Sequence, residues 1–459
     1  MGIFNRMRGW FSMLVKSKAK DEFNIEPISS ERMRSWINEC VNIYQGNPCW
    51  LDEDDHIDTI GFAKALASET ARLATLGIGI KMEGSARANW LQEQIGKVYF
   101  QLRHWVEYGC AYGTIILKPN GDSIDLYTTD MFEITHVTNG VIDGMIFHNW
   151  KKEGKKWYTR LEYHRFEDGL YRITNKCYLG DSPDDTKEQV DIKTTPWDYL
   201  MEEVAISNME KPLFGVFRTP QANNIAMDSP YGLPIFSEAV QELRDLDIAY
   251  SRNSKEIKDS KRTVLLDSDR LLPGGIGNLD RNSLPDYIKL VDGDTSTESD
   301  VYHEINPTLN TDTRLTGINA LLSQIGYKVG FSNGYFVFNE STGIQTATQV
   351  EADQQRTIQF IKDVRDKLES CLDGLIYALD VFATLYSLAP MGAYEAVYDF
   401  GDITYNRDED RTRWWGYVQA GKVPAWRFFV KFEGMTEKEA KEMTEEAQPK
   451  SPTLFGGEE

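Results

Sequence analysis

Residues 331 to 346 read Phe-Ser-Asn-Gly-Tyr-Phe-Val-Phe-Asn-Glu-Ser-Thr-Gly-Ile-Gln-Thr, a segment with glycines and aromatics between two helix-forming stretches. After it, Thr348-Gln-Val-Glu351 matches a capping box, and apolar residues keep a heptad spacing from Ile361 to Leu385. The first turns of that second helix, up to Thr357, offer little that is apolar, so we expect one end buried and the other in water. The preceding helix, from Thr311, places apolar residues on one stripe: Leu315, Ile318, Leu322, Ile325 and Val329.

Another long helix, earlier in the chain, is predicted between Pro234 and about Arg262. Its second half, from Ser251 onward, is almost wholly polar, so it gains little stability from the core of its own domain. We expect it to pack against other long helices or to line a wet surface. Its apolar seam consists of Phe236, Ala239, Leu243, Leu246, Tyr250 and Ile257.

The rest of the chain divides into helical and strand-forming regions. Residues 21 to 110 have mainly helical spacing, whereas 114 to 206 alternate short apolar segments with Asn-Gly, Asp-Gly and Glu-Gly pairs, which predicts an antiparallel sheet. The insert 263–310 carries two candidate strands and is acidic, with nine acidic and three basic residues. The tail from Asp408 is helical. The fold class is therefore α+β and mainly helical.

Composition restricts the function. The 459 residues carry a formal net charge of −21, which argues against a tight DNA binder but not against a protein that touches DNA without holding it. The five cysteines show no C-x-x-C spacing, which is typical of free thiols. No apolar run approaches the roughly 20 residues that cross a bilayer.

The first 20 residues are basic and amphipathic, with no acidic residue before Asp21. They lack the apolar core and cleavage site of a signal peptide. An arm that docks on a partner is favoured, and a helix on a membrane surface stays open.

Candidate chemistry is sparse. Gly416-Tyr-Val-Gln-Ala-Gly-Lys-Val423 nearly matches a phosphate-binding loop, but Val423 replaces the hydroxyl residue that binds magnesium, so a helix ending at Gly421 is the better interpretation. The acidic cluster 51–58 reads as an exposed turn. The sequence therefore predicts no catalytic residue, no metal site and no cofactor.

Four segments, in order and spacing, resemble the portal proteins of long-tailed (siphovirus-type) bacteriophages of Gram-positive hosts. They are Met1-Gly-Ile-Phe-Asn-Arg-Met7, Asp228-Ser-Pro-Tyr-Gly-Leu-Pro-Ile-Phe236, Gly330-Phe-Ser-Asn-Gly334 with Thr346-Ala-Thr-Gln-Val-Glu351, and Gly434-Met-Thr-Glu-Lys-Glu-Ala440. The resemblance implies a ring, typically of about twelve subunits, at one capsid vertex. Each chain would comprise the basic arm 1–20, a wing with an antiparallel sheet (21–232), stem helix 1 (233–262), a small α/β clip (263–310), stem helix 2 (311–330), a tunnel loop (331–346), a long wing helix with a closing strand (347–405), and a short crown with the tail (406–459).

The resemblance also implies partners and a location. Double-stranded DNA would pass through the channel without sequence specificity, moved by a separate terminase ATPase, so this chain would hydrolyse nothing. The terminase large subunit, a head–tail adaptor, and the major capsid and scaffolding proteins would dock on the ring. The protein would lie in the virion, at the portal vertex, after assembly in the cytoplasm of the bacterial host. No membrane is implied.

Site residues follow from the same mapping. The DNA-facing loop would offer uncharged contacts, Gly330, Gly334 and Gly343 would let it change conformation, and Phe336 and Phe338 would alternatively pack on a neighbouring loop. The proposed DNA-facing residues are Asn333, Gly334, Tyr335, Asn339 and Ser341. The channel and stem would use Lys255, Lys258 and Arg262, and the clip would dock terminase or connector through Asp267, Asp269, Asp292 and Asp294.

Three alternatives stay open at this point. Another head–tail adaptor ring would not need so long a helix beside such a loop. A cytoplasmic enzyme would need a pocket of convergent polar groups that the sequence does not indicate. A peripheral membrane protein would depend on residues 1–20 alone.

Overall fold

The computed structural model describes residues 22–26, 28–51, 56–121, 123–183, 186, 188–260, 263–267, 288–291, 302–305, 309–338, 347–401 and 407–446. The chain divides into two compact units, 1–400 and 401–459. Helices and mainly antiparallel sheets give a mixed α/β class, in agreement with the predicted α+β fold. The predicted arm 1–20 and most of the predicted clip lie outside the described residues.

The mainly helical pattern predicted for residues 21 to 110 is confirmed over the described part of that range, and two serines begin helices there. Ser30 and Ser85 accept hydrogen bonds from the backbone amides of Met33 and Ala88, which satisfies amides that a helix start leaves unpaired. Ser30 precedes α2 and Ser85 precedes α4. The helices described in this region are α2 (Glu31–Tyr44), α3 (Phe62–Ala74), α4 (Ala86–Val98), η1 (Tyr99–Gln101) and α5 (Leu102–Tyr112).

The antiparallel sheet predicted for residues 114 to 206 is confirmed, although it forms parts of two sheets. Asn139-Gly140 and Asp168-Gly169 have positive φ angles, as two-residue hairpin turns require. One sheet has the order β10-β2-β3; the other has the order β4-β5-β6-β7-β8, with β9 also on β7. The strands are β2 (Thr114–Asn120), β3 (Ser123–Thr128), β4 (Phe132–Thr138), β5 (Val141–Glu153), β6 (Lys156–Glu167), β7 (Leu170–Gly180), β8 (Glu188–Val190), β9 (Glu203–Ser207) and β10 (Gly215–Arg218), with the turn η2 (Ile192–Thr194) after β8.

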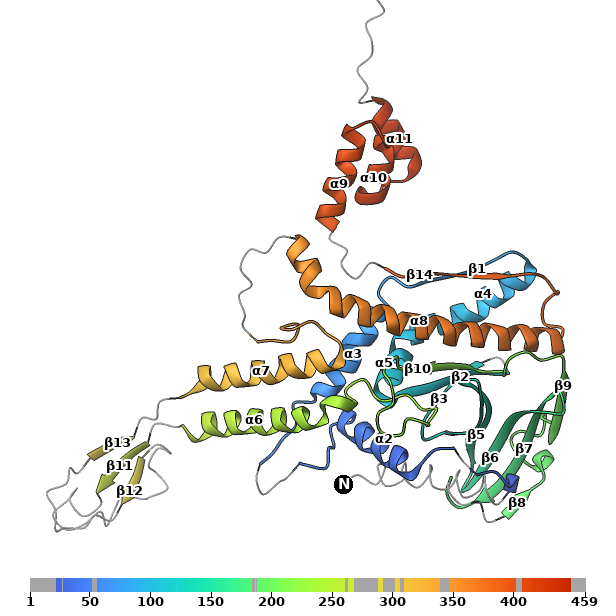
Figure 1. Ribbon diagram of the computed structural model, residues 1–459, viewed down its shortest axis with the longest axis horizontal. Helices are drawn as coiled ribbons and strands as arrows, with labels where there is room; N and C mark the ends of the chain where they lie inside the picture. Colours follow the sequence, from blue (N-terminus) through green and yellow to red (C-terminus); the bar gives the residue numbers. More distant parts are fainter. Residues whose placement is uncertain are drawn as a thin grey trace, which may run out of the picture. The chain divides into compact units, whose positions relative to one another are not determined.

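The long helix α8 (Ala347–Leu385) packs against strand β10 (Figure 1). Two glycines face each other where they meet: a Cβ on Gly215 would lie 2.1 Å from the carbonyl oxygen of Cys371, and one on Gly374 would lie 2.9 Å from the Cα of Gly215. Glycine at both positions therefore lets the helix approach the strand closely.

The heptad seam of α8 is confirmed over most of its length. Ile361 to Ala378 are buried at the predicted positions, but the buried stripe then passes to Leu379 and Ala383, and Leu385 is exposed. A straight helix has 3.6 residues per turn, so its buried face drifts away from a 3.5-residue repeat.

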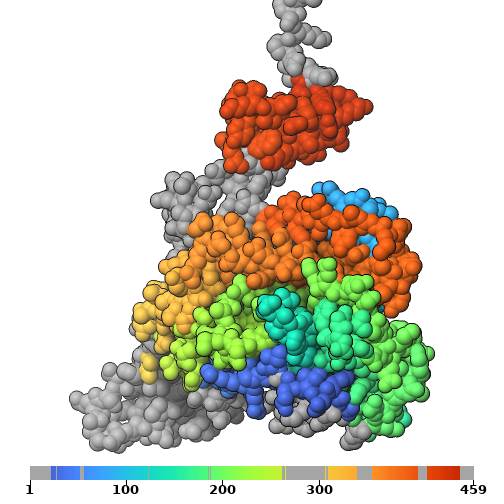
Figure 2. Space-filling model, turned by 45° about the vertical axis from the view of Figure 1, so that its right-hand side comes forward, coloured from blue at the N-terminus to red at the C-terminus, as the bar shows by residue number. Residues whose placement is uncertain are grey.

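Helices α6 (Val240–Asp259) and α7 (Thr311–Val329) form an antiparallel hairpin, and they lie side by side in Figures 1 and 2. The helix predicted within 233–262 is shorter than expected, because the chain after Pro234 first makes the 3₁₀ turn η3 (Ser237–Ala239) and the helix ends at Asp259. The chain between the two helices contains β11 (Thr263–Asp267), β12 (Ile288–Val291) and β13 (Tyr302–Ile305). The central strand β11 is parallel to β12 and antiparallel to β13, which the sequence did not predict.

A two-stranded sheet closes the first unit. Strand β1 (Gly79–Glu83) pairs with β14 (Glu395–Asp399) in antiparallel register. The closing strand was predicted within residues 347–405, but its partner β1 was not predicted.

The second unit contains α9 (Arg407–Gln419), α10 (Ala425–Glu433) and α11 (Glu437–Glu446), as predicted. Gly421 has a positive φ, and the amides of Gly421 and Lys422 donate to the carbonyls of Val418 and Tyr417. This Schellman motif ends α9, so the segment that resembles a phosphate-binding loop is a helix C-terminus, as expected.

Candidate functional site

The α6–α7 hairpin is fixed by ion pairs near both ends. Arg314 pairs with Glu256, and Lys328 pairs with Glu242, so both cations of α7 are neutralised by acids of α6. The Lys328 ammonium also donates to the carbonyl of Glu238 at 3.1 Å. These two ion pairs therefore set the register of α6 against α7 within the hairpin.

The base of α6 is anchored in the first unit by Asp247. Its carboxylate accepts from the Ile60 amide at 2.9 Å and from the Trp50 indole at 2.9 Å. Burial raises the pKa of Asp247, and these hydrogen bonds oppose the shift. One helical turn further on, the Ser251 hydroxyl accepts from the Asp58 amide at 2.9 Å.

Beyond Ser251, α6 extends past the residues that hold its base, which are Trp50, Asp58 and Ile60. Leu243 and Leu246 of the predicted seam are buried, but Tyr250 is 40% and Ile257 is 50% exposed. The expectation of a seam along the whole helix is thus met only near its base. The outer half of α6 presents apolar side chains that the described residues of this chain do not cover.

The predicted stem cations lie on this outer half. Lys255 and Lys258 are exposed and make no ion pair within the described part of the chain. Arg262 lies outside the described residues.

An aromatic cluster holds the first half of the connector between α7 and α8. Phe331 is fully buried, and its ring lies 4.8 Å from Phe336 and 5.7 Å from Phe360. Phe336 also meets Phe62 of α3 edge-on at 5.3 Å. Phe336 therefore packs within its own chain, whereas Phe338 is 46% exposed.

Three polar contacts add to this cluster. The Ser332 amide donates to Thr357 Oγ1 of α8 at 2.8 Å. The Asn319 side chain of α7 accepts from the Phe338 amide at 2.8 Å and donates to the Phe338 carbonyl at 3.0 Å. The third contact, between Tyr335 and Glu69, joins the connector to α3. Residues 331–338 are therefore fixed to α3, α7 and α8.

That third contact engages Tyr335, a predicted DNA-facing residue. Its hydroxyl donates to Glu69 of α3, whose carboxylate also takes two hydrogen bonds from Arg72. The Arg72 guanidinium lowers the pKa of Glu69, while burial and the Glu69 contact raise the pKa of Tyr335. For the Tyr335 hydroxyl to donate to a DNA phosphate, this hydrogen bond would have to break.

The remaining loop residues are placed differently. Asn333 is exposed and Gly334 has a φ of 76° with no atom near a Cβ. Gly330 has a φ of 124°, and a Cβ there would lie 2.7 Å from the Phe360 ring. Asn339, Ser341 and Gly343 lie outside the described residues, as do Asp269, Asp292 and Asp294 of the predicted clip; Asp267 is the last residue of β11.

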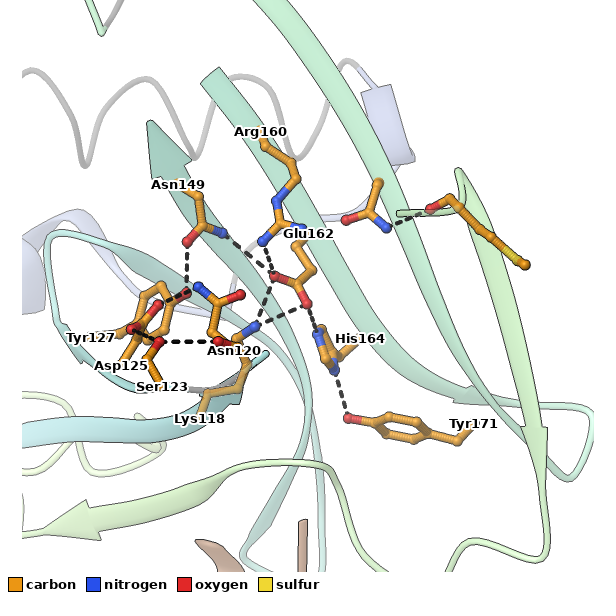
Figure 3. A network of polar contacts seen from close by, with 12 residues as sticks. Lys118, Asn120, Ser123, Asp125, Tyr127, Asn149, Arg160, Glu162, His164 and Tyr171 are labelled. Atoms are coloured by element: carbon orange, nitrogen blue, oxygen red, sulfur yellow. Dashed lines mark hydrogen bonds and ion pairs between the residues drawn. The ribbon is translucent and has the colours of Figure 1, made fainter. Parts of the chain in front are cut away.

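A buried charge network in the sheets was not predicted (Figure 3). Glu162 of β6 accepts from Lys118 of β2 at 2.9 Å, from Arg160 at 2.9 Å and from His164 Nε2 at 2.9 Å. Burial alone would raise the pKa of Glu162, but Lys118, Arg160 and His164 together hold it well below its usual range.

The network fixes the tautomer of His164. The Leu213 amide donates to the Tyr171 hydroxyl at 3.0 Å, so that hydroxyl turns its own proton toward His164 Nδ1, 2.8 Å away. The imidazole then carries its proton on Nε2 and donates it to Glu162.

These groups resemble an acid–base relay, but their burial excludes contact with a substrate. Lys118, Arg160, Glu162 and His164 are at most 7% exposed. Asn149 and Tyr127 continue the network (Figure 3). Both line a cavity of about 730 Å³ between β3, α4 and α8. The network therefore joins strands inside the protein.

Other site types find no support in the part of the chain that the structure describes. No three histidine, cysteine, aspartate or glutamate side chains gather there as metal ligands would. None of the described helices has the length and apolarity for crossing a membrane. All five cysteines are free, and four of them are buried.

The sequence was compared with protein-family models and with curated proteins. Neither comparison found a match. The hairpin, the connector and the resemblance to portal proteins are therefore the observations that bear on function.

Proposed function

We propose that this chain is a portal protein of a siphovirus-type bacteriophage. Identical copies form a ring at the unique capsid vertex, and double-stranded DNA enters and leaves the capsid through its centre. The observation that carries this proposal is the α6–α7 hairpin, whose outer half bears an uncovered apolar seam and lies between an anchored base and a small sheet insert.

The exposed seam favours an assembly over a single chain. A helix gains most of its stability from burying an apolar face, and the outer half of α6 has no such cover within the described residues. Identical copies around an axis can supply it, because a head-to-tail contact repeated by a rotation that closes generates a ring. The hairpins then form the wall of a channel.

The charge pattern is compatible with a passage for DNA. Each phosphate contact by a lysine or arginine adds salt-dependent affinity, which would slow a moving duplex. The acids of α6 neutralise both cations of α7, and the chain as a whole carries a charge of −21. The uncharged Asn333 at the start of the connector suits contacts that read no sequence.

The remaining regions follow from the resemblance. The acidic insert between α6 and α7 would dock the terminase or the head–tail connector, and the first unit would contact capsid and scaffolding proteins. ATP hydrolysis would belong to the terminase. Residues 406–459 would form a short crown and the tail.

Electron microscopy of the purified full-length chain tests the proposal. Rotationally averaged particles should be closed rings with an opening wide enough for a DNA duplex. Compact monomers without an opening would overturn it.

A further inference from the structure

A groove runs along the face of α7 that continues into the connector. It encloses about 780 Å³, and no residue of α6 lines it. Thr316, Ala320 and Ser323 recur at spacings of four and three, so small side chains lie along one face of the helix. Tyr327 and Phe338, 51% and 46% exposed, also line the groove. The groove is thus shaped to accept a ridge of larger side chains.

Helix α6 carries such a ridge on its outer half. Tyr250, Ser254, Ile257 and Lys258 follow at spacings of four, three and one, which places them on one face. Tyr250 and Ile257 are the exposed members of the apolar seam. The ridge and the groove therefore offer complementary surfaces on the two helices of one hairpin.

We propose that the α6 ridge of one copy lies in the α7 groove of the next copy. This inference rests on the proposed ring, and it names the surfaces that build it. The α7 groove is lined without α6, and the ion pairs fix the two helices in one hairpin, so the ridge that fills the groove comes from another copy. Such a contact joins two different surfaces, as a ring requires.

The register of the hairpin supports the match. Glu256 is opposite Arg314 and Glu242 is opposite Lys328. By the same register, Tyr250 is level with Ala320, Ser254 with Thr316, and Lys258 with Asp312. Rotation about an axis parallel to the hairpin leaves each residue at the same height along that axis. The large Tyr250 of one copy therefore meets the small Ala320 of the next copy, and Lys258 meets Asp312.

The charge of the groove favours protein over DNA as its occupant. Among its described lining residues, Asp312 alone is charged. The nearby Arg356 stacks 3.9 Å from the centre of the Tyr327 ring and donates to the Tyr327 carbonyl at 3.0 Å. DNA binding draws its affinity from cations facing phosphates, and this groove offers an acid instead.

Disulfide cross-linking of the full-length chain tests the contact. Cys49, the exposed native cysteine, is first replaced by serine. Tyr250→Cys combined with Ala320→Cys should then give a ladder of covalent oligomers on mild oxidation, because a disulfide needs Cα atoms about 4.4–6.8 Å apart. Arg252→Cys with Ala320→Cys is the matched control, since Arg252 is exposed on another face of α6 and should give no ladder.

A second pair keeps the test decisive if the first variant does not fold. Lys258→Cys with Asp312→Cys should give the same ladder from two exposed positions. Intact rings by microscopy without a ladder from either folded pair would overturn this inference and leave the proposed ring standing. Particles that form no rings and no ladder would overturn both.

Discussion

At the scale of residues, Glu162 shows how one side chain organises the interior of the sheets. Arg160, Glu162 and His164 alternate along β6 and therefore share one face of the strand, and Lys118 reaches them from β2. Their mutual pairing satisfies charges that would be unstable alone in the interior. Removing one partner should therefore cost far more than breaking an ion pair at the surface.

Replacing Glu162 by Gln should destabilise the protein by about 3–5 kcal/mol, because Lys118 and Arg160 lose the carboxylate that compensates them in the interior. Urea unfolding followed by tryptophan fluorescence would measure the loss at a fixed protein concentration. Glu167→Gln is the control, since Glu167 is 49% exposed and pairs with Arg165 and Arg172 at the surface. Its loss should be no more than about 1 kcal/mol. Equal losses for the two variants would contradict this account of the network.

His148 should make stability depend on pH, because burial lowers its pKa to about 4. Below its ordinary pKa near 6.5, the unfolded chain binds a proton that the folded chain refuses until about pH 4. Protonation therefore favours unfolding in that window, by up to about 1.4 kcal/mol per pH unit. The unfolding free energy of a His148→Phe variant should fall less steeply than that of the wild type between pH 6.5 and 4. Identical slopes would show that His148 titrates normally in the folded protein.

This interior was hard to predict from the sequence. Arg160-Leu-Glu-Tyr-His164 alternates polar and apolar residues, a pattern typical of a strand with one face in water. The structure buries both faces, because Lys118 and Tyr171 come from other strands to pair with the polar side chains. A single strand carries no signal for partners that the topology brings from elsewhere.

At the scale of elements, local patterns predicted α7 and the heptad face of α8 well, since spacing and capping act within one helix. Strand β1 was missed because its partner β14 lies more than three hundred residues later. The fixed position of residues 331–338 was also missed. Its cause is packing against Phe62 and Glu69, which no local pattern reveals.

The two glycines in this connector should respond differently to substitution by alanine. At Gly330 a Cβ would lie 2.7 Å from the Phe360 ring, whereas at Gly334 nothing lies within 4 Å, and both have a positive φ. Gly330→Ala should therefore lower the free energy of unfolding by about 1–3 kcal/mol more than Gly334→Ala, because it adds overpacking to backbone strain. Thermal or urea unfolding of the two variants measures this difference. A larger loss at Gly334 would show that the first half of the connector is not packed as described.

At the scale of the whole molecule, one chain alone leaves apolar surfaces of its helical hairpin uncovered among the described residues. The first unit has a buried hydrophobic core around α8 and the sheets. In contrast, no described residue of the chain covers the apolar side chains on the outer half of α6 or fills the groove of α7. The sequence could indicate that α6 extends beyond the core of its own domain, because the second half of this helix is almost wholly polar. It could not assign individual residues to the channel or to a neighbour, since that depends on how copies meet.

The mass of the purified full-length protein in solution decides whether copies of the chain assemble into a ring. Native mass spectrometry should find one dominant species at an integer multiple of 52.5 kDa, about twelve chains, that persists on dilution. A folded species at 52.5 kDa across the same concentrations would show that the hairpin needs no partner, and would contradict the ring.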